Sequence, residues 1–186
     1  MSLKFWNNLS PTKKRILTIA IVFVAVTIVT GLAMLTPVTK TQATDTNNQV
    51  NQTVTSLEQP GEESLFTSIF GNNFFITMIM FIPFLGPLFG FITFYNTGVV
   101  VESEAIAQGY PPGALYAAQF LLPVIWLEFI SYSTAMAASM WLSARIIQGD
   151  FKHEITNTAK FMALCAIILL ISAAIETALI YAVKSS

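Results

Sequence analysis

Residues 65–101, LFTSIFGNNFFITMIMFIPFLGPLFGFITFYNTGVVV, decide the fold of this chain. The stretch is almost wholly apolar and about 37 residues long, whereas a helix that crosses a membrane needs roughly 20 apolar residues. Its middle contains Pro83, Gly86 and Pro87, and prolines remove backbone donors and break helices. We therefore expect two helices here, joined by a tight turn.

The remaining apolar runs extend this pattern to the whole chain. Pro37 is expected to end the first run, and Pro123 to break a long run near its start. The sequence thus predicts an all-α fold, a polytopic transmembrane helical bundle of about five helices with Pro/Gly breaks, and residues 1–186 form a single integral membrane domain. The expected transmembrane helices are 16–36, 65–82, 88–108, 114–147 (broken near 123) and 159–183.

One segment differs sharply from these runs in composition. Residues 38–63 are rich in Thr, Asn and Gln and have almost no large apolar side chains. Such a composition is typical of a disordered segment, so we expect a polar extracytoplasmic loop. The loop contains Asn51-Gln52-Thr53, a sequon that predicts glycosylation of Asn51 if the loop lies outside the cell.

Overall composition excludes several classes of function. Hydrophobic residues make up 54% of the chain and charged residues only 10%, against about a quarter in a soluble domain. A net charge of −1 and the lack of a basic motif predict no nucleic-acid binding. Cys165 and His153 are the only residues of their types, so no metal site is expected, and no cofactor or enzyme motif is present. The expected partners are membrane lipids and other integral membrane subunits or further copies of the chain.

The positive charges predict the topology. Five crossings with the N-terminus in the cytoplasm would leave the C-terminus outside, with most Lys and Arg residues on the cytoplasmic side. Cytoplasmic segments would then hold Lys4, Lys13, Lys14, Arg15, Arg145, Lys152 and Lys160, and outer segments only Lys40 and Lys184. This bias follows the positive-inside rule and favours five crossings. The alternative is a re-entrant hairpin over residues 65–108, buried by the rest of the protein.

Two acidic residues lie inside apolar sequence and are candidates for function. Glu128 and Glu176 fall about 8 and 12 Å from the outer ends of their expected helices, so they can share one level. An ionisable group at membrane depth is costly unless it is paired or protonated. Either the two residues order helix interfaces, or they form a proton or cation site to which Glu102 and Glu104 contribute from the outer end of their helix.

A further set of residues is expected to break helices or to let helices approach closely. Ser131, Ala135 and Ser139 recur every four positions, which places small side chains on one helix face. Amides in apolar sequence, such as that of Asn96, favour hydrogen bonds between helices. The full set is Pro83, Gly86, Pro87, Gly90, Asn96, Gly98, Pro123, Ser131, Ala135 and Ser139.

The stretch from Phe70 to Arg145 resembles the stage II sporulation protein M family. The residues that carry the resemblance are Asn72 or Asn73 at the start of an apolar helix, Gly86, Gly90, Asn96, Gly98, Pro123 and Glu128. In the family, His and Gly follow the proline, whereas here Val124 and Ile125 do, so a role that depends on the histidine is in doubt. The resemblance implies the plasma membrane of a bacterium or archaeon and, in sporulating bacteria, a scaffold that helps to localise cell-wall hydrolases during engulfment.

Two functions remain open at the level of sequence. The first is a non-enzymatic integral membrane scaffold or accessory subunit that packs against partners through small-residue faces. The alternative is a small channel or transporter with a proton or cation site at the buried Glu residues, since broken helices with a buried acid are typical of transport sites. A water-filled cavity reaching Glu128 and Glu176 would favour transport, and a dry, hydrogen-bonded interface would favour the scaffold.

Overall fold

The computed structural model describes residues 6, 8–58 and 62–184, and the regular elements of this part are helices without strands. The expected all-α class is therefore confirmed. The helices are α2 (Pro11–Ala33), α3 (Lys40–Glu58), α4 (Glu62–Met80), α5 (Leu85–Gln108), α6 (Pro112–Gln119), α7 (Pro123–Ile147) and α8 (Lys152–Lys184).

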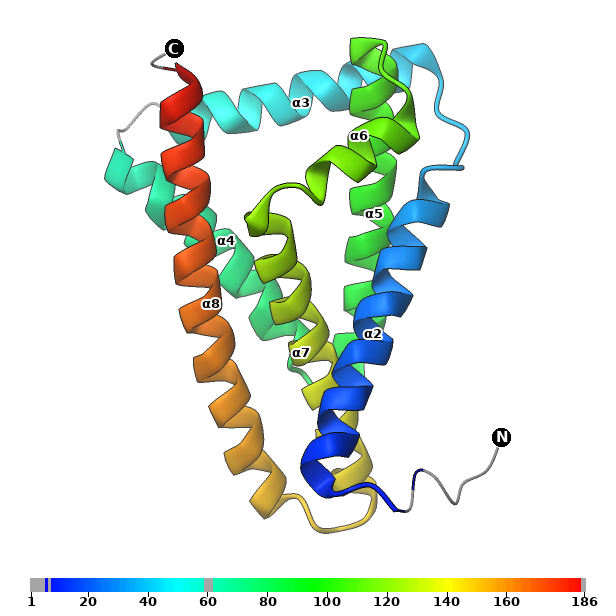
Figure 1. Ribbon diagram of the computed structural model, residues 1–186, viewed down its shortest axis with the longest axis vertical. Helices are drawn as coiled ribbons and strands as arrows, with labels where there is room; N and C mark the ends of the chain where they lie inside the picture. Colours follow the sequence, from blue (N-terminus) through cyan, green and yellow to red (C-terminus); the bar gives the residue numbers. More distant parts are fainter. Residues whose placement is uncertain (1–5, 7, 59–61, 185–186) are drawn as a thin grey trace.

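The long helices form a bundle around α7 (Figure 1). In the view of Figure 1, α2, α5 and α8 run from the lower end to the upper end, α4 and α7 run the other way, and α3 lies across the upper end. Helix α7 packs against α2, α4, α5 and α8. Residues 131–139 of α7 are buried on every side, which its small side chains permit because neighbouring helices can approach closely.

Several helices have the length and composition of membrane spans. Helices α2 and α8 qualify by themselves, and the pair α6–α7 would be a third span if its bent halves are taken together. The apolar part of α4 within the searched residues, Leu65–Met80, is shorter. Among the described residues, two helices, or three with the bent pair, are thus long and apolar enough to cross a membrane.

The first helix break lies at Pro83, between the end of α4 and the start of α5. Phe84 has a positive φ of 65°, which turns the chain sharply before α5 begins. The expectation that Pro87 also belongs to the break is wrong, because Pro87 lies in the first turn of α5. Proline is tolerated there since the first amide groups of a helix have no partner within the helix.

The second break lies before Pro123 and separates α6 from α7. Pro123 is the first residue of α7, a position for which its fixed φ is suited. The two helices meet at an angle of 84°. The indole N–H of Trp126 donates to the carbonyl oxygen of Phe120 at 2.8 Å and so ties α7 to the end of α6.

The polar segment expected to be a loop is instead the helix α3. Thr39 and Gln42 form a capping box at its start. The backbone N–H of Gln42 donates to Thr39 Oγ1, and the backbone N–H of Thr39 donates to Gln42 Oε1. No proline or glycine interrupts residues 40–58. Ala43 is fully buried, and α3 packs against α5. This packing stabilises the helix in addition to its capping box.

The ends of two other helices differ from expectation. Helix α2 ends at Ala33, before the expected residue 36, and begins at Pro11 with Ser10 as its N-cap. Helix α8 begins at Lys152 rather than at residue 159. The added first turns of α8 are polar, and hydropathy therefore gave no sign of them, although no Pro or Gly follows Gly149 in the chain.

An aromatic cluster fills part of the interior. Phe94 of α5 meets Phe129 of α7 edge to face, with ring centroids 4.8 Å apart. Phe129 also contacts Phe23 of α2 and Phe120 beside α6. The cluster joins α2, α5 and the end of α6 to α7, and each edge-to-face pair stabilises this contact beyond the apolar area that it buries.

Candidate functional site

Glu128, the first buried acid, is held by a partner on another helix. The side-chain amide of Asn73, on α4, donates to Glu128 Oε1, on α7, at 2.6 Å. Asn73 is only 9% exposed, and Glu128 is partly buried. One turn further along α4, the buried hydroxyl group of Thr77 also has a partner, because Thr77 Oγ1 donates to the backbone carbonyl oxygen of Asn73 at 2.7 Å. The contact joins α4 to α7 in the middle of the bundle.

Glu176, the second acid, lies on α8 close enough to Glu128 for the two carboxylates to interact electrostatically. Tyr132 of α7 lies near both. The structure thus brings together the two acids that the sequence placed at one level. Two negative charges inside apolar surroundings repel each other and lose hydration, so this arrangement favours a proton on one of them or a cationic partner.

Glu176 also lines a cavity of about 540 Å³ between the start of α7 and the end of α8. We call this cavity the Glu176 groove. Apart from the one carboxylate, its lining side chains are apolar. The lining residues are Leu122, Val124, Ile125, Glu176, Leu179, Ile180 and Val183.

Glu102 and Glu104 do not join this pair by any contact described in the structure. They lie near the end of α5, and two positions apart on a helix means about 200° around its axis, so they face different sides. Ser103 between them is 1% exposed. One carboxylate oxygen of Glu102 is buried without a hydrogen-bond partner among the described residues. A four-carboxylate site is therefore not assembled in this arrangement.

The break at Pro83 is stabilised by two serines of α7. Ser139 Oγ donates to the carbonyl oxygen of Ile82 at 2.7 Å, and the amide N–H of Phe84 donates to Ser143 Oγ, also at 2.7 Å. The Ile82 carbonyl oxygen also accepts from the backbone N–H of Gly86 at 2.8 Å, so the two serines add to the hydrogen bonds within the turn. Irregular backbone at membrane depth requires such partners, because lipid supplies none.

The glycines expected at close contacts lie where helices touch. A Cβ atom on Gly86 would overlap the backbone oxygen of Met80. One on Gly90 would overlap the side chain of Met136, and one on Gly98 the backbone oxygen of Thr30. Gly86 thus permits the tight turn between α4 and α5, while Gly90 and Gly98 let α5 approach α7 and α2.

The other expected interface residues divide into buried and exposed ones. Ser131 and Ala135 are fully buried in α7, and the Cys165 thiol donates to the Ser131 carbonyl oxygen at 3.5 Å. Asn96, in contrast, is exposed on α5. Its expected contact within the bundle is thus not formed in the described structure.

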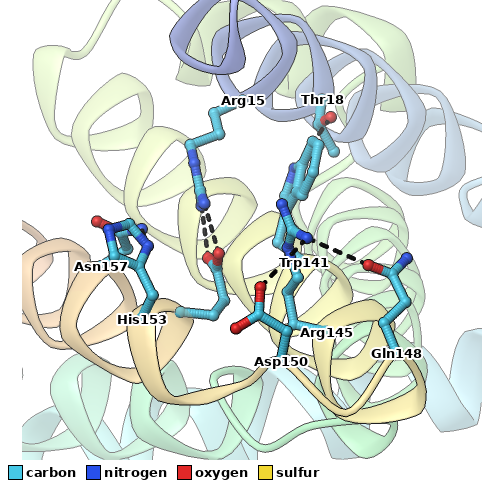
Figure 2. Close-up of polar contacts among 9 residues, drawn as sticks. Arg15, Thr18, Trp141, Arg145, Gln148, Asp150, His153 and Asn157 are labelled. Carbon is cyan, nitrogen blue, oxygen red and sulfur yellow. Dashed lines mark hydrogen bonds and ion pairs between the residues drawn. The ribbon is translucent and has the colours of Figure 1, made fainter.

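An ion pair at the opposite end of the bundle was missed by sequence reasoning. Arg15, near the start of α2, donates two hydrogen bonds to the carboxylate of Glu154, near the start of α8, at 2.5 and 2.6 Å (Figure 2). The Glu154 side chain is 3% exposed and that of Arg15 17%. The guanidinium also lies over the ring of Trp141, 5.1 Å from its centroid, and Trp141 Nε1 donates to Thr18 Oγ1. The pair was missed because Glu154 was assigned to a loop, although the helix-compatible residues 152–158 could have revealed it.

A polar pocket of about 340 Å³ lies beside this ion pair. Arg145 and Asp150 line it, with 3.8 Å between their charged atoms, and Arg145 also donates to Gln148 (Figure 2). His153 lies 3.3 Å from the amide nitrogen of Asn157, one turn along α8. Across the described residues, no three His, Cys, Asp or Glu side chains are grouped to hold a metal ion. Asn51 is exposed on α3, and its glycosylation stays a prediction.

The fold and these contacts define a class: an all-α protein with apolar helices of membrane-spanning length and polar groups satisfied between helices. The model of the family Stage II sporulation protein M matches residues 19–179. The chain belongs to this family of membrane proteins. The resemblance noted over residues 70–145 is thereby confirmed over a longer range. No match was found among curated proteins or among solved structures.

Proposed function

We propose that this protein is a non-enzymatic integral membrane scaffold or accessory subunit of a membrane protein complex, in the plasma membrane of a bacterium or archaeon. The observation that carries the proposal is the hydrogen bond of Glu128 to Asn73 inside a packed interface of α4 and α7. A transport site needs a polar path to its acid. Here the cavity at Glu176 has six other lining residues, and all of them are apolar.

The proposal includes five crossings with the N-terminus in the cytoplasm and the C-terminus outside. It is supported by the alternating directions of α2, α4, α5, α7 and α8 in Figure 1. Arg15, Arg145 and Lys152 then fall at one end of the bundle, in agreement with the positive-inside rule. Helix α3 would lie on the outer surface, and α6 at the outer boundary of the membrane.

Topology can be tested with single cysteines in a Cys165→Ala background. Asn48→Cys on α3 and Asp150→Cys after α7 place thiols at two exposed positions. With a membrane-impermeant maleimide, we expect Asn48→Cys to react in intact cells and Asp150→Cys only after permeabilisation. Reaction of both from outside would contradict five crossings.

The scaffold role can be tested by gentle detergent purification from native membranes, followed by native mass spectrometry. We expect a different membrane protein to co-purify at a fixed stoichiometry. A homo-oligomer without partners would contradict the proposal if, in liposomes, it also conducts protons or cations and loses this flux on Glu128→Gln. In that case the transport alternative would replace it.

A further inference from the structure

Helix α8 packs against α7 and α4, and it extends beyond the start of α7. Helix α7 begins at Pro123, and Ser172 Oγ of α8 donates to the carbonyl oxygen of Val124 at 3.4 Å. Helix α8 continues from Ser172 to Lys184, about 18 Å further. The chain before α7 does not accompany it, because α6 turns away by 84°.

The Glu176 groove occupies the space that this mismatch leaves. On α8 its lining residues follow the spacing of one helix face, from Glu176 through Leu179 and Ile180. Leu179 is 39% exposed and Leu122, on the opposite wall, 44%. The groove is therefore open to the outside of the bundle and presents one carboxylate in an apolar wall.

No Lys or Arg of this chain lies in the part of α8 around Glu176. Residues 41–144 and 161–183 contain no Lys or Arg, and Lys160, two turns into α8, lies toward the end of that helix opposite to Glu176. In a second copy with the same orientation, the basic residue nearest in depth to Glu176 is Lys184, about 12 Å away along α8, so such a copy supplies no cation at the depth of Glu176. A lipid chain could fill the groove but would leave the carboxylate unpaired.

We propose that the Glu176 groove receives a transmembrane helix of a different protein that carries a Lys or Arg at the depth of Glu176. This inference rests on the proposed function and names the docking surface and the chemistry of the partner. The apolar walls contact the partner's side chains, and a long basic side chain reaches the carboxylate while its methylene groups pack in the groove. An acid and a base that meet in lipid each remove the other's uncompensated charge.

A designed peptide can serve as the probe. The full chain is reconstituted in phosphatidylcholine vesicles with a labelled Leu/Ala helix of about 22 residues that carries a single Lys about 12 Å from its outer end. A second peptide has Leu in place of Lys. Association is measured by energy transfer, and we expect the Lys peptide to bind at least about tenfold more tightly than the Leu peptide, a difference of about 1.4 kcal/mol.

Three variants identify the site of binding. Glu176→Gln is expected to abolish the preference for the Lys peptide, and Leu179→Trp, which fills the groove, to weaken binding of both peptides. Glu104→Gln, a partly buried acid on α5 that does not line the groove, is the matched control and keeps the preference. Equal binding of the two peptides, or a preference that survives Glu176→Gln, would overturn the inference.

The result can be separated from the fate of the proposed function. If a native partner co-purifies equally with the wild type and with Glu176→Gln, the scaffold role stands and the groove is not its docking surface. If no native partner co-purifies, the protein conducts protons or cations through Glu128, and the Lys peptide still binds through Glu176, the groove has the chemistry proposed for it and the scaffold role fails.

Discussion

The two ends of the bundle surround their acidic residues in opposite ways. At the end where α2 and α8 begin, both oxygens of Glu154 are bound by Arg15 of the same chain. At the other end, Glu176 lies in an open apolar groove beside a second acid. One carboxylate is used to fasten helices together, and the other is available to something outside the chain. Glu154 is explained by its ion pair within the chain. Glu176 has no such pair among the described residues, and it is therefore the better candidate for a functional residue.

The largest expected effect comes from breaking the Arg15–Glu154 ion pair. We call the end of the bundle that contains this pair the closed end, and the half that contains Glu128 and Glu176 the open half. Arg15→Ala removes the partner of a buried carboxylate and its contact with Trp141. Loss of one member of a buried pair costs about 3–5 kcal/mol, because an uncompensated charge remains. We expect the free energy of unfolding in detergent to fall by about that amount, measured by equilibrium denaturation.

The matched control is Arg145→Ala at the same end. The Arg145 side chain is 40% exposed and its distance to Asp150 is 3.8 Å. Exposed pairs contribute about 0–1 kcal/mol, so this variant should hardly change stability. Equal effects of the two substitutions would show that the buried pair has no special role.

The next effect tests the turn at Pro83, also near the closed end. Gly86→Ala would force a Cβ atom against the Met80 carbonyl and Ser139. Overpacking of this kind costs about 1–3 kcal/mol, which a denaturation midpoint can resolve. Gly71→Ala, where nothing lies within 4 Å of the new atom, should be neutral or slightly stabilising. If Gly86→Ala unfolds like Gly71→Ala, the turn is looser than described.

A smaller effect is expected from the serine that caps this turn. Ser139→Ala removes one of the two hydrogen bonds that the carbonyl oxygen of Ile82 accepts, the other coming from the backbone N–H of Gly86 at 2.8 Å, at a cost of about 0.5–1.5 kcal/mol. Ser133→Ala is the control on the same helix, because Ser133 is equally buried and its Oγ has no partner among the described residues. We expect only Ser139→Ala to lower the temperature of thermal unfolding. If both variants lower it equally, packing of the serine side chain matters and the hydrogen bond does not.

The smallest effect belongs to the open half of the molecule. Asn73→Ala removes the hydrogen bond to Glu128, and such bonds within membranes average about 0.6 kcal/mol. Asn72→Ala, at the exposed neighbouring position, removes only a long hydrogen bond of 3.5 Å to Asn73 Oδ1 and should lower stability by less still. A loss from Asn73→Ala as large as that from Arg15→Ala would remove the contrast between the two ends.

The breaks and the buried acids were predictable because they depend on local rules. Proline cannot donate a backbone hydrogen bond, so Pro83 and Pro123 indicated helix breaks whatever the packing. Glu128 and Glu176 stood out because charge is rare within apolar runs. Pro87 was misread because the same residue that breaks a helix is tolerated in its first turn, and only the exact start of α5 decides between the two.

The polar helices and their contacts were not predictable from hydropathy. Helix α3 was read as a loop from its composition, although Thr39 and Gln42 carry the capping signal. The pair Arg15–Glu154 joins residues 139 positions apart, and its formation depends on how α2 and α8 meet. The groove was also hidden, because it arises from the direction in which α6 leaves α7.

Helix α3 has a mechanical consequence for the open half. Its 19 residues make a rod about 28 Å long that crosses the bundle between the end of α2 and the start of α4 (Figure 1). A helix of this length holds its own two ends at a fixed separation, which a flexible segment of the same length would not do. Removing one turn from α3 would shorten this rod by about 5.4 Å and change which of its residues contact α5.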